Sequence, residues 1–183
     1  MTEKEKMLAG ELYNASDEIL VNERNRAYNL CFEYNSLNKN YCDRRKEIVK
    51  ELLGKVGENF NIESDFRCDY GYNIEVGENF YSNYNLVILD VNKVLFGNNV
   101  FISPNCSFYT AGHPIDPKVR NSGLEFGKPI TVGNNVWIGG NTVILPGITI
   151  GNNVTIGAGS VVTKNVEANS VVAGNPARVI KKI

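Results

Sequence analysis

The C-terminal half of this 183-residue chain repeats a pattern of six residues. Aliphatic residues return at steps of six in one long row, which comprises Val132, Ile138, Ile144, Ile150, Ile156 and Val162. Three steps span 18 residues, as from Val132 to Ile150, and this is the pattern of a parallel β-helix with three short flat faces. In such a coil each aliphatic side chain points inward and stacks on its equivalent one coil further on. The row therefore predicts a mainly β protein built as a parallel β-helix of hexapeptide repeats.

A recurring five-residue phrase marks the corners of this β-helix. It occupies residues 56–60, 76–80, 96–100, 132–136 and 150–154, and in each copy a glycine follows the first apolar residue and an asparagine stands fourth. Glycine and asparagine suit corners because they tolerate positive φ better than other residues do. We expect both residue types to adopt positive φ at these corners.

The row is interrupted once. Continued in steps of six from Phe96, it reaches Pro114 and Arg120, which cannot fill inward stacking positions. Residues 109–128 are therefore expected to leave the prism as an extruded loop, and a loop of this length inside a compact domain is usually functional. The root of this loop carries His113.

The region before the repeats is expected to be helical. In residues 1–54 apolar side chains recur at helical spacing, Ser16 or Asp17 can cap a second helix, and Asp43 can open a third. The predicted organisation is a helical N-terminal segment, 1–54, followed by the β-helix with its loop and a C-terminal tail, 55–183.

The composition limits the binding partners, the cellular compartment and the metal sites that can be expected. A formal net charge of −1 gives no reason to expect a nucleic acid or an anionic membrane as partner. The N-terminus carries charges of both signs and no apolar stretch, so no secretory signal is visible and we expect a cytoplasmic protein. The four cysteines form no CxxC pair and only one histidine is present, which predicts free thiols and no metal site.

Five segments carry a family resemblance: residues 3–13 (EKEKMLAGELY), 66–74 (FRCDYGYNI), 112–117 (GHPIDP), 133–140 (GNNVWIGG) and 174–178 (GNPAR). They resemble the maltose/galactoside O-acetyltransferases of the hexapeptide-repeat family, more closely the maltose type. The resemblance implies a left-handed β-helix, and homotrimers with acetyl-CoA in a groove between neighbouring subunits. The implied reaction is transfer of an acetyl group to a sugar hydroxyl.

The resemblance also implies the residues of the site. His113 would be the catalytic base, and Asn83 would stabilise the oxyanion or position the acceptor. The residues implied for the acceptor sugar are Asp17, Arg26, Asp69, Tyr81 and Asn83. Those implied for acetyl-CoA are Gly140, Ala158, Thr163, Lys164, Arg178 and Lys181.

Four positions depart from the galactoside type. Asp69 stands where that type has serine and Val91 where it has a carboxylate, which favours a maltose- or glucose-like acceptor. Gly140 replaces a serine, and Lys181 replaces an arginine.

The residues themselves support the same chemistry. Acyl transfer to a hydroxyl needs a group that removes the hydroxyl proton, and histidine has an ordinary pKa near neutrality. His113 is the only histidine in the chain. A covalent route through Cys68 or Cys106 is the alternative, but neither adjoins a recognisable base in sequence, so we expect direct attack.

A cationic tail fits the phosphates of acetyl-CoA. Residues 128–183 hold one acidic residue and five basic ones, which are Lys128, Lys164, Arg178, Lys181 and Lys182. The other interpretation is that these lysines only keep the terminus soluble.

Several interpretations stay open at this point. Asp17 could be a helix N-cap as well as a sugar contact, and Asn83 could be a corner residue of the β-helix with no catalytic role. Trp137 fits a packing role better than a sugar platform. For the whole chain, the alternatives are a non-catalytic scaffold on the same fold and an acyltransferase with a non-sugar acceptor.

Overall fold

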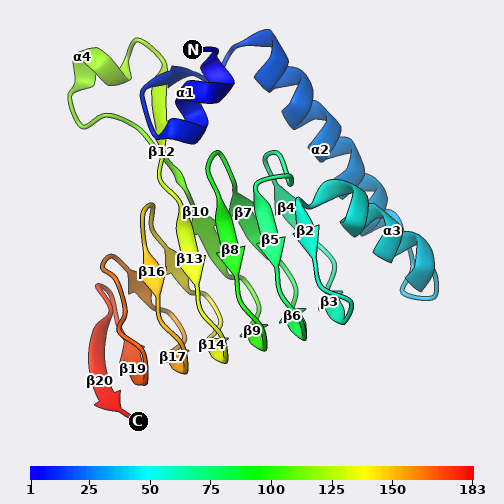
Figure 1. Ribbon diagram of the computed structural model, residues 1–183, viewed down its shortest axis with the longest axis vertical. Coiled ribbons are helices and arrows are strands. Elements are labelled where there is room, and N and C mark those ends of the chain that lie inside the picture. The colour runs from blue at the N-terminus through cyan, green and yellow to red at the C-terminus, as the bar shows by residue number, and fades with distance from the viewer.

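The chain begins with helices and continues as a prism of short strands (Figure 1), and the computed structural model describes all 183 residues. The helices are α1 (Glu3–Ala9), α2 (Glu18–Ser36), α3 (Cys42–Leu52) and, within the later loop, α4 (Pro117–Arg120). Asp17 is the residue that caps α2, because its Oδ1 accepts from the backbone N–H groups of Ile19 and Leu20 at 3.1 and 3.3 Å. The prediction that Asp43 opens the third helix is wrong by two residues. The N-cap of α3 is Tyr41, and Asp43 lies in its first turn.

Three sheets form the faces of the prism. The strands are β2 (Lys55–Val56), β3 (Phe60–Ile62), β4 (Arg67–Cys68), β5 (Ile74–Val76), β6 (Phe80–Ser82), β7 (Val87–Leu89), β8 (Val94–Phe96), β9 (Val100–Ile102), β10 (Ser107–Tyr109), β13 (Ile130–Val132), β14 (Val136–Ile138), β15 (Val143–Ile144), β16 (Thr149–Ile150), β17 (Val154–Ile156), β18 (Val161–Val162), β19 (Ser170–Ala173) and β20 (Arg178–Lys182). The first sheet is β2-β5-β8-β13-β16, the second β4-β7-β10-β15-β18, and the third β3-β6-β9-β14-β17-β19-β20. The predicted mainly β, left-handed parallel β-helix is confirmed.

The inward row stacks as predicted. Val132 pairs in register with Ile150, and Ile138 with Ile156. All six residues of the row are buried, each with at most 2 % of its surface exposed. Burial of this kind is the main stabilising contribution in a fold whose coils contact only their neighbours.

Asparagines form a hydrogen-bonded ladder along the edge between the first and third sheets. Its rungs are Asn59, Asn79, Asn99, Asn135, Asn153 and Asn169, and each Nδ2 donates to the next Oδ1 at 2.6 to 3.0 Å. From Asn79 onward the rungs adopt φ of 56° to 57°.

The glycine of the phrase has a different role from the asparagine. The expectation that it also adopts positive φ is wrong, because the phrase glycines are absent from the positive-φ residues. Instead, a Cβ on Gly97 would lie 2.8 Å from the backbone carbon of Gly133 one coil further on. Asparagine therefore supplies the turn and glycine supplies the clearance between coils.

The loop leaves the prism after β10 as an antiparallel ribbon with α4 at its tip (Figure 1). Its strands are β11 (Ala111–Gly112) and β12 (Leu124–Gly127), and β1 (Tyr13–Asn14) pairs with the other side of β12. The backbone N–H of Lys128 donates to the carbonyl of Thr110 at 2.9 Å and closes the neck of the loop. The N-terminal segment is thereby bound to the loop through one small sheet.

Candidate active site

A hollow of about 290 Å³ lies where the N-terminal segment, the prism and the loop meet. Of the predicted site residues, it brings together His113 and Asp69. Its lining consists of Tyr13, Ala15, Arg24, Asp69, Tyr70, Leu89, Val91, Ala111, His113 and Glu125.

His113 follows β11 directly and is exposed. The ribbon behind it is tightly packed, since a Cβ on Gly112 would lie 2.6 Å from the ring of Phe126. The imidazole makes no hydrogen bond to another residue of the chain, so both ring nitrogens are open to a ligand or a neighbouring side chain. The loop thus presents an accessible imidazole from a firmly held strand.

Asp90 fixes the backbone that presents Asp69. Its buried carboxylate accepts from the N–H groups of Asp69 and Tyr70, both at 2.9 Å, and of Gly71 at 2.7 Å. Burial raises the pKa of Asp90 to about 7, although hydrogen bonds from the three N–H groups act in the opposite direction. The carboxylate of Asp90 therefore points into the protein. Its neighbour Val91, which stands where the galactoside type has a carboxylate, faces the hollow.

Asp69 is a half-buried carboxyl group in this hollow. Burial raises the pKa of Asp69 to about 6, while the nearby Arg24 lowers it and Glu125 raises it further. Above that pH the carboxylate accepts hydrogen bonds, as from a hydroxylated ligand. Below it the protonated group also donates one.

Arg24 lines the hollow, whereas the arginine named from the resemblance, Arg26, does not. Arg24 donates to the hydroxyl of Tyr70 and to the carbonyl of Ala15, both at 2.7 Å. Arg26 points elsewhere and pairs with Glu51 at 3.3 Å. The helical period of α2 could have indicated Arg24, because this residue lies four positions after the buried Leu20 and therefore on the inner face of the helix.

Glu125 and Tyr13 also line the hollow, and no local pattern in the sequence indicates either residue. The hydroxyl of Tyr13 donates to Oε2 of Glu125 at 3.1 Å. The two residues are 112 positions apart in the chain and meet only because β1 pairs with β12.

Seven of the predicted residues, His113 and Asp69 among them, lie on two edges of the prism. The loop edge, between the second and first sheets, carries Asp69, His113, Thr163 and Lys164. The Gly140 edge, between the third and second sheets, carries Asn83, Gly140 and Ala158. Within one chain the structure does not bring Asn83 to His113.

The other acceptor candidates lie outside the hollow. Oδ1 of Asn83 accepts from the backbone N–H of Tyr84 at 2.8 Å, while its Nδ2 has no partner in the chain. Tyr81 lies on the outer surface of the third sheet beside Phe101. Trp137 lies in the same outward row and is 56 % exposed, so the packing role expected for it would be on the outer surface of the sheet and not in the interior of the prism.

The tail places Arg178 and Lys181 on β20, which runs antiparallel to β19. Both side chains are exposed. The guanidinium of Arg178 donates to the carbonyl of Ala177 at 2.8 Å and has no carboxylate partner. A free cation of this kind is suited to a phosphate.

Cys68 and Cys106, the two cysteines considered for a covalent route, are poor nucleophiles here. Burial raises the pKa of Cys106, and the neighbouring Cys31 thiol together with burial raises the pKa of Cys68. Cys31 and Cys68 are free thiols with their sulfurs 3.8 Å apart. None of the four cysteines lines the hollow that holds His113.

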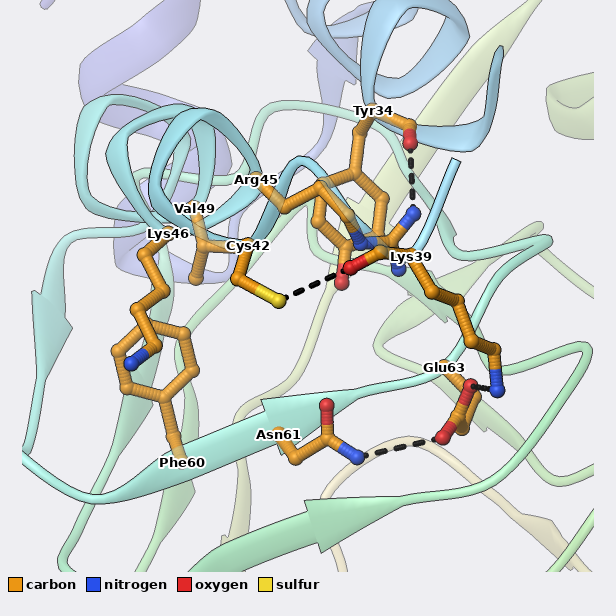
Figure 2. A pocket seen from close by; sticks show the side chains of 9 residues that line it. All are labelled: Tyr34, Lys39, Cys42, Arg45, Lys46, Val49, Phe60, Asn61 and Glu63. Atoms are coloured by element: carbon orange, nitrogen blue, oxygen red, sulfur yellow. Dashed lines mark hydrogen bonds and ion pairs between the residues drawn. The ribbon is translucent and has the colours of Figure 1, made fainter. Parts of the chain in front are cut away.

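A second hollow, of about 280 Å³, lies between α3 and β3 (Figure 2). Arg45 is buried there and donates to the carbonyls of Tyr34 and Ile62 at 2.9 and 3.2 Å. Lys39 pairs with Glu63 at 2.6 Å. Two of its cations are thus already bound to groups of the chain and fasten the helices to the first coil.

Two wider properties bear on the kind of site. No helix combines the length and the apolar character needed to cross a bilayer. The structure also places no group of three or more His, Cys, Asp or Glu side chains where they could hold a metal ion.

A prism of hexapeptide coils with a histidine at the root of one extruded loop defines a class, the hexapeptide-repeat acyltransferases. Two family models match the chain. The maltose acetyltransferase hexapeptide capping motif covers residues 6–57, and the bacterial transferase hexapeptide covers residues 129–164.

Solved structures agree over the full length. A maltose O-acetyltransferase from Clostridium difficile 630 is 55 % identical, with a TM-score of 0.99 over 100 % of this chain and 98 % of that one. A galactoside acetyltransferase in complex with coenzyme A is 44 % identical, with a TM-score of 0.97 over 100 % and 92 %. A hexapeptide-repeat acetyltransferase from Vibrio cholerae, complexed with acetyl coenzyme A, is 36 % identical, with a TM-score of 0.91 over 100 % and 98 %.

The chain belongs to the maltose/galactoside O-acetyltransferase family of hexapeptide-repeat proteins. It is a CoA-dependent acetyltransferase.

Proposed function

We propose that the protein moves an acetyl group from acetyl-CoA to a hydroxyl of a sugar, with His113 as general base. The observation that carries the proposal is the shared hollow, in which an accessible imidazole lies beside Asp69, a carboxyl group able to bind hydroxyls. One imidazole nitrogen takes the hydroxyl proton while the sugar oxygen attacks the thioester carbonyl. The C–S bond then breaks, and His113 passes the proton to the departing sulfur. A base of this kind contributes about 10² to 10⁴ in rate.

The lining of the hollow favours a maltose- or glucose-like acceptor. Asp69 supplies a carboxylate where the galactoside type has serine, and the apolar Val91 lies where that type has a carboxylate. Compared with the galactoside type, the carboxylate available to a sugar is thus at position 69 and not at position 91. The names of two similar structures, a maltose O-acetyltransferase and a galactoside acetyltransferase, support sugars as the acceptor class.

The test is a panel of acceptors assayed by CoA release. Maltose, glucose, a galactoside, serine and an amine are compared at equal concentration, with hydrolysis in buffer subtracted. We expect the highest kcat/KM for maltose or glucose. Turnover with serine or the amine and none with any sugar would replace the proposal with a non-sugar acyltransferase. No turnover above hydrolysis with any of the five compounds would rule out the proposed acceptor class.

We further propose that the active enzyme is a trimer whose sites lie between subunits. Seven of the predicted residues are split between the loop edge and the Gly140 edge, so a site that uses both groups needs one edge from each of two copies. Each copy has both edges, which suits a closed ring. The exposed Phe101 and Trp137 on the third sheet are apolar surface available for such contacts.

Sedimentation is expected to show a trimer, and mixing two inactive variants is expected to restore activity. His113→Ala and Asn83→Ala, unfolded and refolded together, would recover about a quarter of the sites if each site takes one residue from each of two subunits. The same variants mixed without refolding are the control. A fully active monomer, or a lack of recovery after verified mixing, would contradict the intersubunit site.

Arg178→Ala is expected to raise the KM for acetyl-CoA about tenfold or more, because a hydrogen bond to a charged group contributes roughly 1.5 to 3 kcal/mol. The sugar KM is expected to change little. The matched control is Lys182→Ala, since Lys182 already pairs with Glu167 at 2.7 Å.

A second donor, acetyl-dephospho-CoA, lacks the 3′-phosphate and so shows which phosphate group Arg178 contacts. A smaller loss with that donor would place Arg178 at the 3′-phosphate, and equal losses would place it at the pyrophosphate. An unchanged KM with both donors would remove Arg178 from the site.

A further inference from the structure

Three residues, Tyr13, Glu125 and His113, lie in one row across the small sheet β1-β12-β11. Tyr13 of β1 pairs in register with Glu125 of β12. On the other side of β12, Ala111 pairs with Gly127 and Gly112 with Phe126. The antiparallel register, continued by one residue, places His113 opposite Glu125. Opposite residues of an antiparallel pair project to the same face with Cβ atoms about 4.5 to 5.5 Å apart, and all three residues line the hollow.

One of the two carboxylate oxygens of Glu125 has no hydrogen-bond partner in the chain. Its Oε2 accepts from the hydroxyl of the fully buried Tyr13 at 3.1 Å. Its Oε1 accepts no hydrogen bond from the chain. The Tyr13 contact holds the carboxylate from one side, which leaves Oε1 for a donor on the other side, where His113 lies.

The other charged and titratable groups of the hollow are less suited to this place. Arg24 is engaged by Tyr70 and Ala15, and its charge opposes an imidazolium. Asp69 follows β4 and belongs to the prism wall, whereas Glu125 is on the ribbon that also carries His113.

We propose that Glu125 is a positioning residue for His113: Oε1 accepts from one imidazole N–H, which leaves the other ring nitrogen unprotonated to take the acceptor's proton. The inference rests on the proposed role of His113 as base. A carboxylate in this position fixes the tautomer and the orientation of the ring, and it stabilises the imidazolium formed during attack. Hydrogen bonds of this kind are often longer in the free enzyme than in the reacting complex.

Glu125→Gln tests the proposal on the whole protein. The amide oxygen can still accept from Tyr13, which turns the amide NH₂ toward His113 and favours the wrong tautomer. We expect kcat to fall about tenfold to a hundredfold, with the KM for acetyl-CoA unchanged. Because the chain has a single histidine, the ¹⁵N spectrum of the free enzyme reports which ring nitrogen carries the proton. We expect this tautomer ratio to change in Glu125→Gln.

Two further variants keep the test decisive. Tyr13→Phe removes the Tyr13 hydrogen bond but retains the carboxylate, so the wild-type tautomer should persist. Glu125→Asp retains the charge on a shorter side chain, so it should recover part of the kcat lost in Glu125→Gln. It also replaces Glu125→Gln if the latter fails to fold.

The ring spectrum needs no substrate, so it separates this proposal from the proposed function. An unchanged tautomer in Glu125→Gln overturns the role of Glu125 even if His113 proves to be the base. A tautomer change in Asp69→Asn but not in Glu125→Gln would assign the role to Asp69 and also overturn the proposal.

Discussion

His113→Ala is expected to lower kcat by at least about a hundredfold, because the variant has no group to accept the acceptor's proton. The fold and the affinity for acetyl-CoA should survive, since His113 is exposed on the loop and outside the stacked interior. The measurement is steady-state CoA release with the best sugar of the panel, together with a thermal melt and direct binding of acetyl-CoA.

A matched change on the same loop separates chemistry from disturbance of the loop. Ile115 is 95 % exposed two residues further on, so Ile115→Ala should retain kcat within about threefold. His113→Asn retains a polar side chain without a base and should be as impaired as His113→Ala. Near-normal turnover in both His113 variants would rule out the general-base mechanism.

Asp90→Ala is expected to destabilise the fold by roughly 3 to 5 kcal/mol, because three backbone N–H groups lose their acceptor inside the protein. For a chain of this size that corresponds to a fall in Tm of roughly 10 °C or more. The turn that presents Asp69 should also loosen, and the sugar KM should rise. Calorimetry at one fixed protein concentration is the measurement, since oligomers melt in a concentration-dependent way.

Ser82→Ala is the matched control, a second substitution of a buried polar residue by alanine. Ser82 is fully buried, and its hydroxyl has no hydrogen-bond partner. Its removal should therefore be neutral or slightly stabilising. Equal destabilisation by the two changes would mean that loss of side-chain volume, and not loss of an acceptor, explains the effect of Asp90→Ala.

The prism was predictable because the sequence pattern that specifies it is local and repeats every six residues. A six-residue row identifies the inward positions one by one, and Pro114 and Arg120 identify the residues that leave the row. The distinct roles of Gly97 and Asn99 were not predictable. The clearance beside Gly97 depends on how closely the next coil approaches, and the period does not show that spacing.

The hollow was predictable only in part. His113 could be named because it is the only histidine and lies in the loop, and Asp69 because the resemblance covers its segment. Glu125 could not be named, since its position depends on two strand pairings between distant parts of the chain. Arg24 was missed in favour of Arg26, although the spacing from Leu20 places Arg24 on the inner face of α2.

The closed neck of the loop bears on how such enzymes can diverge. β8 pairs directly with β13 although 36 residues separate their ends at Phe96 and Val132, so the coils continue in register across the insertion. Mutations and changes of length beyond the hydrogen bond from Lys128 to Thr110 therefore leave the stacking of the coils intact. Selection can alter the loop residues that line the hollow, such as Ala111 and Glu125, while the coils that carry Asp69 and Val91 stay constant. A lineage can thus remodel the loop wall of the hollow without altering the coils that form its other wall.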